Sequence, residues 1–169
     1  MPCTLALGGR NLPCFKTQGG LKTIYFAGFV DGGITSGTAS AQTWYEYALK
    51  GGSSLETAIN GSRENNSVFY TQTVTIQLAL LDSVTQIDLE ELAESKPHIV
   101  VEDYNGQQWL IGAEHGADLL SGTFSTGANL GDFSGFNLTF EAQEVSAPIY
   151  LSSAVTGETI TVSPAIVAS

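Results

Sequence analysis

The clearest pattern in the chain is the alternation of apolar and polar residues over positions 67–81. Successive side chains of a strand point to opposite faces, so the alternation predicts a strand with one buried face. A strand of about fifteen residues would span roughly 50 Å, which is much longer than usual. We therefore expect it to extend beyond the core of its own domain. Its predicted apolar face holds Val68, Tyr70, Val74, Ile76, Leu78 and Leu80, and its polar face holds Thr71, Thr73, Thr75 and Gln77.

Two other segments carry strong strand signals. Residues 21–30 are rich in aromatic and β-branched side chains, which predicts a strand that is covered on both faces. Residues 133–145 alternate, with an expected inward set of Phe136, Leu138, Phe140 and Ala142. Weaker strand signals lie at 42–50, where a short helix also fits, within 117–132, and at 148–151 and 158–163.

One helix is expected, over residues 82–97. Ser83 with Gln86 has the spacing of a capping box, and Asp88 with Glu91 is an alternative start. Several acidic residues lie in the first turns, where the helix dipole favours them, and the helix is expected to end before Pro97. The apolar stripe of this segment is only partly regular, so the helix should cover one face or one open end of a sheet.

A hairpin is expected directly after this helix. Residues 98–104 and 107–113 flank Asn105-Gly106, which predicts a two-residue turn with positive φ at both positions. Glu102 and Asp103 then point to opposite faces, which separates the acids of this region.

Glu114, His115 and Asp118 lie beyond the second strand of this hairpin, without the spacing of a metal site. We expect a solvated turn there. His98 is expected at a helix terminus or strand edge, and not as a ligand.

The remaining segments read as irregular. Residues 1–20 hold two Pro and four Gly and predict an N-terminal arm. Residues 51–66 contain Gly-Gly, Asn-Gly and Asn-Asn and predict a long exposed loop. Residues 152–169 form a low-charge C-terminal tail. The chain is thus expected to be a single β-rich domain over 21–151, a sandwich or partial barrel with one helix.

The net charge and the cysteines narrow the range of possible functions. The formal net charge is −11, from 17 acids and 6 bases, which disfavours phosphate wrapping or groove reading. No apolar run is long enough to span a membrane, and no cleaved export signal is recognisable. Cys3 and Cys14 are expected to be free thiols, because neither a disulfide nor a zinc site is well supported.

Motifs of catalysis and cofactor binding do not occur. The chain has no GxSxG, Walker A, GxGxxG or CxxC sequence, and its two histidines have no defined partner. We therefore expect neither an enzyme nor a cofactor.

The order of elements resembles that of the major tail tube proteins of tailed bacteriophages and the related Hcp proteins of type VI secretion. The likeness covers residues 21–151, with one acidic-started helix after the long central strand and the closing run GFNLTFEAQE at 135–144. The opening CTLALGGRNLPCFKTQGGLKTIYF is similar to the start of structural proteins from phages of marine and gut Bacteroidetes.

The resemblance implies a virion protein that is assembled in the host cytoplasm and becomes part of the tail. Family members form stacked rings, usually hexameric, whose inner sheets join into one barrel around a channel for DNA. Its partners would be further copies of itself and other tail proteins, with DNA passing through unbound and no membrane contact. The 1–20 arm and the 152–169 tail would bridge subunits. The low base count departs from this picture, since it leaves few partners for salt bridges between subunits.

Two sets of residues are candidates for these roles. Thr71, Thr73, Thr75 and Gln77 are candidates for the channel wall, and Gly51, Gly52, Arg63 and Glu64 are candidates for a ring-stacking loop. A head decoration, stopper or tail terminator protein would fit the same composition. A carbohydrate-binding module is a further alternative, which would need Trp44, Tyr45, Tyr47 and Trp109 exposed on one plane.

Overall fold

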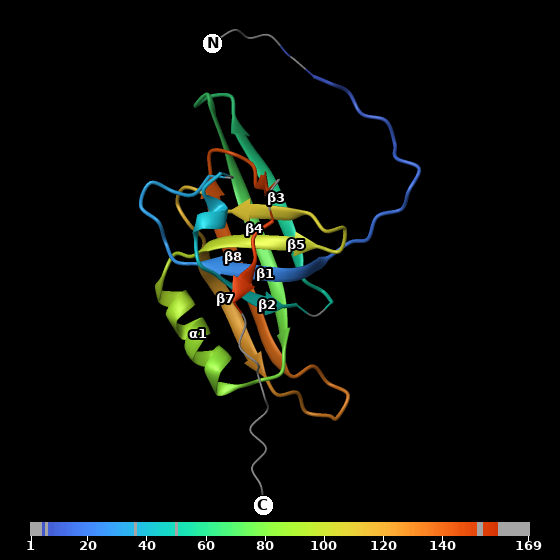
Figure 1. Ribbon diagram of the computed structural model, residues 1–169, viewed down its shortest axis with the longest axis vertical. Coiled ribbons are helices and arrows are strands. Elements are labelled where there is room, and N and C mark those ends of the chain that lie inside the picture. Colours follow the sequence, from blue (N-terminus) through green and yellow to red (C-terminus); the bar gives the residue numbers. More distant parts are fainter. Residues whose placement is uncertain (1–4, 6, 36, 50, 152–153, 159–169) are drawn as a thin grey trace, which may run out of the picture.

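The computed structural model describes residues 5, 7–35, 37–49, 51–151 and 154–158, which form two β-sheets packed face to face and one α-helix (Figure 1). The predicted class, mainly β with one helix in a sandwich-like arrangement, is confirmed. Within the described residues the sheets do not close into a barrel. The strands are β1 (Leu21–Ala27), β2 (Trp44–Ala48), β3 (Ser54–Ser62), β4 (Ser67–Ala79), β5 (His98–Asp103), β6 (Gln108–Ile111), β7 (Asp118–Ser125), β8 (Gly135–Glu144), β9 (Ile149–Leu151) and β10 (Gly157–Glu158).

The four-stranded sheet has the order β3-β4-β8-β7, and every neighbouring pair in it is antiparallel. β4 lies in its interior and is 13 residues long, so the long strand expected at 67–81 is confirmed. Val74, Ile76 and Leu78 are buried as the alternation predicts. Leu80 was assigned to the same face, but it lies beyond the strand end, where its φ of 73° ends the extended backbone.

The six-stranded sheet has the order β10-β2-β1-β5-β6-β9. The expected strands at 42–50, 117–132, 133–145 and 148–151 are confirmed as β2, β7, β8 and β9. Of the strand expected at 158–163, only Glu158 lies within the described residues, and it pairs with β2 in parallel.

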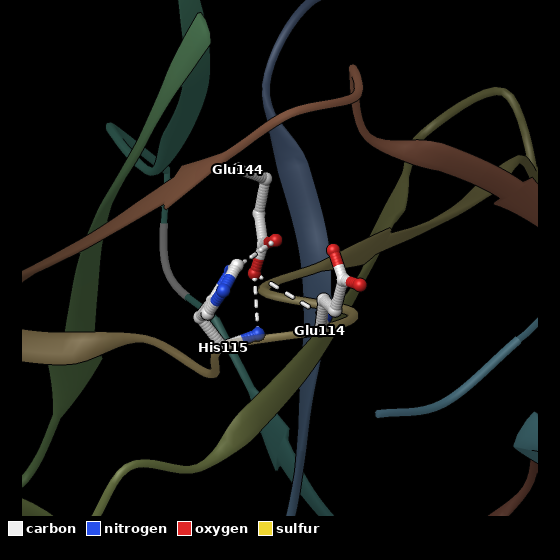
Figure 2. A group of neighbouring side chains, drawn as sticks. All are labelled: Glu114, His115 and Glu144. Carbon is white, nitrogen blue, oxygen red and sulfur yellow. Dashed lines mark hydrogen bonds and ion pairs between the residues drawn. The ribbon is translucent and has the colours of Figure 1, made fainter. Parts of the chain in front are cut away.

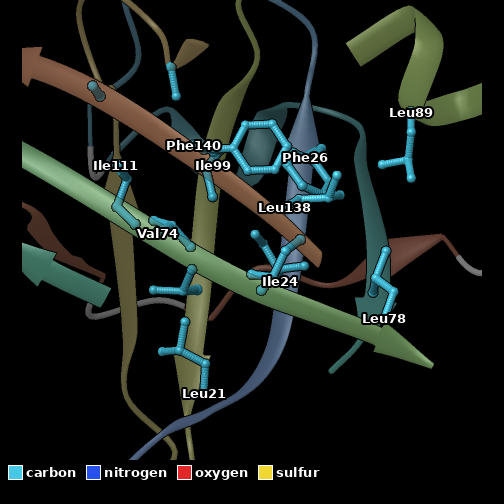
Figure 3. Packing of buried hydrophobic residues seen from close by; sticks show 14 of the residues in the cluster. Leu21, Ile24, Phe26, Val74, Leu78, Leu89, Ile99, Ile111, Leu138 and Phe140 are labelled. Carbon is cyan, nitrogen blue, oxygen red and sulfur yellow. The ribbon is translucent and has the colours of Figure 1, made fainter. Parts of the chain in front are cut away.

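The main core fills the space between the two sheets (Figure 3). Its contacts join β1 and β5 of the six-stranded sheet to β4 and β8 of the four-stranded sheet. Phe26 of β1 lies 5.2 Å from Phe140 of β8, measured between ring centroids, and packs edge-on against Tyr47. Burial of these side chains is the main favourable contribution to folding.

A second core covers the other face of the six-stranded sheet, which confirms that β1 is buried on both faces. Trp44 is fully buried there, and its Nε1–H donates to the carbonyl of Ala39 at 2.6 Å. Val155 packs in the same cluster and exchanges two hydrogen bonds with the side chain of Gln108. The beginning of the C-terminal tail therefore docks on its own domain.

The helix α1 (Ser83–Glu94) begins one residue after its cap, Asp82. The Asp82 carboxylate accepts a hydrogen bond from the Thr85 N–H at 2.9 Å, so both expected caps, Ser83 and Asp88, were wrong. Leu89 is buried in the main core and Leu92 packs against it. α1 thereby covers one open end of the sandwich, as expected.

The hairpin of β5 and β6 is confirmed, but its turn differs from the expected one. Only Gly106 has a positive φ, 84°, and Asn105 does not. Gly106 N–H bonds the carbonyl of Asp103, and Asp103 N–H bonds that of Gln107. This is a turn with a glycine bulge, in which one left-handed residue suffices.

The long exposed loop expected at 51–66 was wrong, because residues 54–62 form β3. Nine residue pairs join β3 to β4, from Ser54 with Thr75 to Ser62 with Ser67. As an edge strand, β3 is held by these backbone pairs and needs no continuous apolar face. The β3–β4 hairpin projects beyond the rest of the sandwich (Figure 1).

Ile76→Ala should lower the free energy of unfolding by about 2–5 kcal/mol, because it opens a cavity in the main core. Val68→Ala lies on the same strand, but its side chain is 57% exposed in the projecting hairpin. The Val68→Ala variant should change the free energy of unfolding of the monomer by less than about 0.5 kcal/mol. Denaturant unfolding measures both, and equal losses would mean that the two ends of β4 are equally buried.

Candidate functional site

The four-stranded sheet turns one face away from the main core, and we call it the outer face. Thr71, Thr73, Thr75 and Gln77 lie on it, half-buried along β4, as the alternation predicts. Their neighbours on β8 are Gln143, Glu141, Thr139 and Asn137, and Thr75, Thr73 and Thr71 lie beside Ser54, Glu56 and Ala58 of β3. The sheet thus presents a broad polar surface, most of it uncharged.

The charges on the outer face are acidic. Glu56, Thr73, Glu141 and Asp118 form one row across all four strands. The sequences of β3, β4, β8 and β7 contain no Lys or Arg. Lys96 lies at the margin, where it lines a hollow of about 340 Å³ together with Asp118 and Glu141.

Both edges of this sheet are open among the described residues. β3 with nine residues and β7 with eight are the terminal strands, and neither pairs with a further strand. Edge strands of monomeric proteins are usually protected by lysine, proline or short length. β3 and β7 contain no Lys or Pro and one acid each, Glu56 and Asp118.

The candidate ring-stacking residues do not share one loop. Gly51 and Gly52 lie in the turn before β3, and Arg63 and Glu64 lie in the turn after it. The nine residues of β3 separate the two turns by roughly 30 Å. Arg63 and Glu64 stand at the tip of the projecting hairpin, near the exposed apolar side chains of Ile59 and Val68.

The turn that follows β6 is anchored by a buried acid, Glu144, which ends β8 and is 3% exposed (Figure 2). Its Oε1 accepts the backbone N–H groups of Glu114 and His115, at 3.3 and 2.8 Å. Its Oε2 lies 2.9 Å from Nδ1 of His115. In the turn that was expected to be solvated, the side chains of Glu114 and His115 are exposed, but the buried Glu144 carboxylate holds the backbone in place.

Two further buried polar side chains hold the same turn. Gln72 of β4 accepts the Gly112 N–H through Oε1 and donates to the Ser146 carbonyl through Nε2. His98 is fully buried, with Nδ1 2.6 Å from the Gly112 carbonyl and Nε2 accepting the Val30 N–H. Since Nε2 accepts a hydrogen bond, Nδ1 is the nitrogen that donates to the Gly112 carbonyl. The expectation of a helix terminus or strand edge was wrong, because His98 starts β5, which lies between β1 and β6 in the interior of its sheet.

The backbone of the turn requires glycine at two positions. Gly112 and Gly116 have φ of 63° and 76°, which L-residues rarely adopt. A Cβ on Gly116 would also lie 2.7 Å from the Lys96 carbonyl. The turn is therefore specified both by its glycines and by the polar side chains beneath it.

Glu114, His115 and Glu144 bring possible metal ligands within 4.8 Å of one another. Both Glu144 oxygens already accept hydrogen bonds, and Nδ1 of His115 is engaged with one of them. A cation would have to displace these bonds from a carboxylate that fixes the backbone. The arrangement is that of a structural ion pair, in which the Glu144 carboxylate raises the pKa of the exposed His115 imidazole.

The four aromatic residues weighed for carbohydrate binding do not form one exposed plane. Trp44 is buried, Tyr47 donates its hydroxyl to Asp88, and Trp109 packs edge-on against Tyr150. Burial and the bond to Asp88 raise the pKa of the Tyr47 phenol. Of the two cysteines, Cys14 is an exposed free thiol and Cys3 lies outside the described residues.

Glu144 and Gln72 were missed as anchors, although the sequence carries a signal for both. Glu144 continues the inward set of Phe136, Phe140 and Ala142, and Gln72 is in phase with Val74 and Ile76. A polar residue on the apolar phase of a strand predicts a buried hydrogen-bonding role.

No helix in the described part of the chain combines the length and apolar character needed to cross a membrane. No protein-family model matches the sequence, and comparisons with curated proteins and with solved structures also found no match.

Gln72→Leu should lower the free energy of unfolding by about 2 kcal/mol, because it leaves the buried Gly112 N–H without its partner and also removes the bond to the Ser146 carbonyl. Gln143→Leu, on the outer face, makes the same chemical change at an exposed position and should stay within about 0.5 kcal/mol of wild type. Chemical denaturation compares the two, and a loss shared by both variants would contradict the anchoring role.

The His115–Glu144 pair should make stability depend on pH. Since folding raises the His115 pKa, the stabilisation is fully present below the usual value of 6.5 and is lost as pH rises through the raised value. His115→Ala should therefore reduce the melting temperature most at acidic pH, with a difference that shrinks above neutrality. In a Glu144→Gln background this pH dependence should disappear. A difference that stays constant across the range would contradict the pair.

Proposed function

We propose that the chain is the subunit of a homo-oligomeric ring of the phage tail tube type, with the outer face lining a pore through which DNA passes. The observation that carries the proposal is the pair of open edges, β3 and β7, on one four-stranded sheet. Two unprotected strands of matching length are a liability in a monomer, because they offer free N–H and C=O groups to other chains. In a ring these two edges would form the contact between neighbouring subunits.

The strand directions suit ring closure. Directions alternate in the order β3-β4-β8-β7, so β3 and β7 of one subunit run in opposite directions. Rotation about a ring axis preserves the direction of each strand relative to that axis. β7 of one copy and β3 of the next would therefore meet as an antiparallel pair, and the sheet would continue around the ring as a heterologous, closed contact.

The chemistry of the outer face suits a DNA channel. Threonine, serine, glutamine and asparagine side chains keep the surface hydrated and do not bind phosphate strongly. The acids Glu56, Glu141 and Asp118 repel the phosphate backbone, so DNA could slide without adhering. The acidic balance of the chain then reflects passage of nucleic acid and not its recognition.

The projecting hairpin suits contact between stacked rings. The inner face of the four-stranded sheet continues past the end of the six-stranded sheet, where Ile59 and Val68 are 71% and 57% exposed. An adjacent ring would cover these side chains. Of the four residues expected to stack rings, only Arg63 and Glu64 are at this tip, and Gly51 and Gly52 would act at the other end of β3.

Proline substitution at the edge tests the proposal. Consecutive residues of β3 point their N–H groups in opposite directions, so of Thr57 and Ala58 one bonds β4 and the other faces the free edge. Proline is tolerated on a free edge and not inside a ladder. Of Thr57→Pro and Ala58→Pro, the variant that keeps the wild-type melting temperature should therefore fail to form rings.

Sedimentation and negative-stain microscopy of wild type and both variants give the outcome. Wild type should form rings with a central hole, or tubes at high concentration. Assembly of the stable proline variant into the wild-type particle would contradict edge pairing. A single closed ring that never stacks would instead favour a tail terminator or stopper, and a trimer without a pore would favour a head decoration protein.

A further inference from the structure

The N-terminal arm is a basic and apolar segment on an acidic protein. Residues 1–20 hold Arg10 and Lys16 and no acid, although the chain has a net charge of −11. Four large apolar side chains of the arm are exposed, including Leu12 at 92% and Phe15 at 72%. Exposed apolar side chains that cluster in this way are typical of a segment that binds another protein surface.

A groove of complementary character lies between α1 and the six-stranded sheet. Its volume is about 370 Å³, within the range of binding clefts. Phe26, Tyr45 and Leu92 give it apolar walls, and Asp88 and Glu91 of α1 add acids. Among the residues that the structure describes, no Lys, Arg or His lines it.

The arm is complementary to this groove in composition. Leu12 and Phe15 are flanked by Arg10 on one side and Lys16 on the other, so an apolar pair stands between two cations. Pro13 restricts Leu12 to extended backbone, which lowers the entropic cost of docking. The bases would reach the acids while the apolar pair fills the groove.

We propose that the arm of one copy docks in the α1 groove of a second copy, with Leu12 and Phe15 against Tyr45 and Leu92. The inference rests on the proposed self-assembly only in requiring a second copy, and it does not depend on the particle being a tube. Each chain has one arm and one groove, so the contact links copies head to tail.

The root of the arm directs it away from its own groove. The backbone N–H and carbonyl of Gln18 both bond the side chain of Asn105, in the β5–β6 turn. β1 then runs roughly 20 Å before reaching Ala27 at the groove. In Figure 1 residues 7–20 curve away from the body on the side opposite to α1.

Disulfide trapping tests the contact in the full-length chain. Cys14 lies between Leu12 and Phe15 and is a free, exposed thiol. With Cys3 replaced by serine, Glu91→Cys places one partner thiol in the groove. Oxidised glutathione should then produce a ladder of linked chains on a non-reducing gel. Its yield should exceed by roughly tenfold that of a Val84→Cys control, because docking holds the thiols at an effective concentration of about millimolar. Val84 is exposed on the same helix but does not line the groove.

Two arm variants sharpen the result without touching the folded domain. Leu12→Asp with Phe15→Asp should reduce the ladder to the control level, and Arg10→Glu with Lys16→Glu should reduce it in part. A cross-link confined to single chains would overturn docking on a second copy. Equal yields at positions 84 and 91 would overturn docking in the groove.

Microscopy of the same samples separates this inference from the proposed function. Rings or tubes without the ladder would overturn arm docking alone. A ladder from particles without a pore would overturn the tube and leave arm docking in place.

Discussion

The pairing of β4 with two neighbours organises the molecule. β4 bonds β3 along nine residue pairs and β8 along ten, and its inward side chains form much of the main core. β4 has 13 residues and extends beyond the six-stranded sheet. The six-stranded sheet therefore covers one part of the four-stranded sheet and leaves the projecting hairpin uncovered. The open edges, the polar outer face and the projecting hairpin all belong to this sheet. Its incomplete cover is the physical reason to expect assembly.

The buried polar anchors show how the sandwich is closed at the turn after β6. Gln72, His98 and Glu144 come from three different strands and meet on one short turn, where each of them bonds backbone groups of that turn. Within the described residues every buried side-chain nitrogen or oxygen has a partner. Such fully bonded networks favour one arrangement over nearby alternatives. The acids and the histidine of this region therefore serve the fold, and the exposed charges on the outer face are free for another role.

Strict alternation made β4 and β8 predictable, and the turn residues made the β5–β6 hairpin predictable. β3 was missed because its Asn-Gly and the Gly-Gly before it are typical of loops, whereas long-range pairing with β4 decides its conformation. The helix cap was misplaced because several acids and serines near residue 82 have suitable spacing, and only the geometry selects Asp82. The outer face could be assigned from sequence. The α1 groove could not, because Phe26, Tyr45 and Leu92 are distant in sequence and only the packing of α1 brings them together.

The central claim is that the four-stranded sheet continues from one copy to the next around a pore. A cryo-electron microscopy map of the assembled protein, at a resolution that separates strands, tests it most directly. We expect β7 of each subunit to lie hydrogen-bonded beside β3 of its neighbour, with Thr73 and Glu141 facing the lumen. Particles in which β3 and β7 remain unpaired, or in which the outer face lies on the outside, would contradict the account.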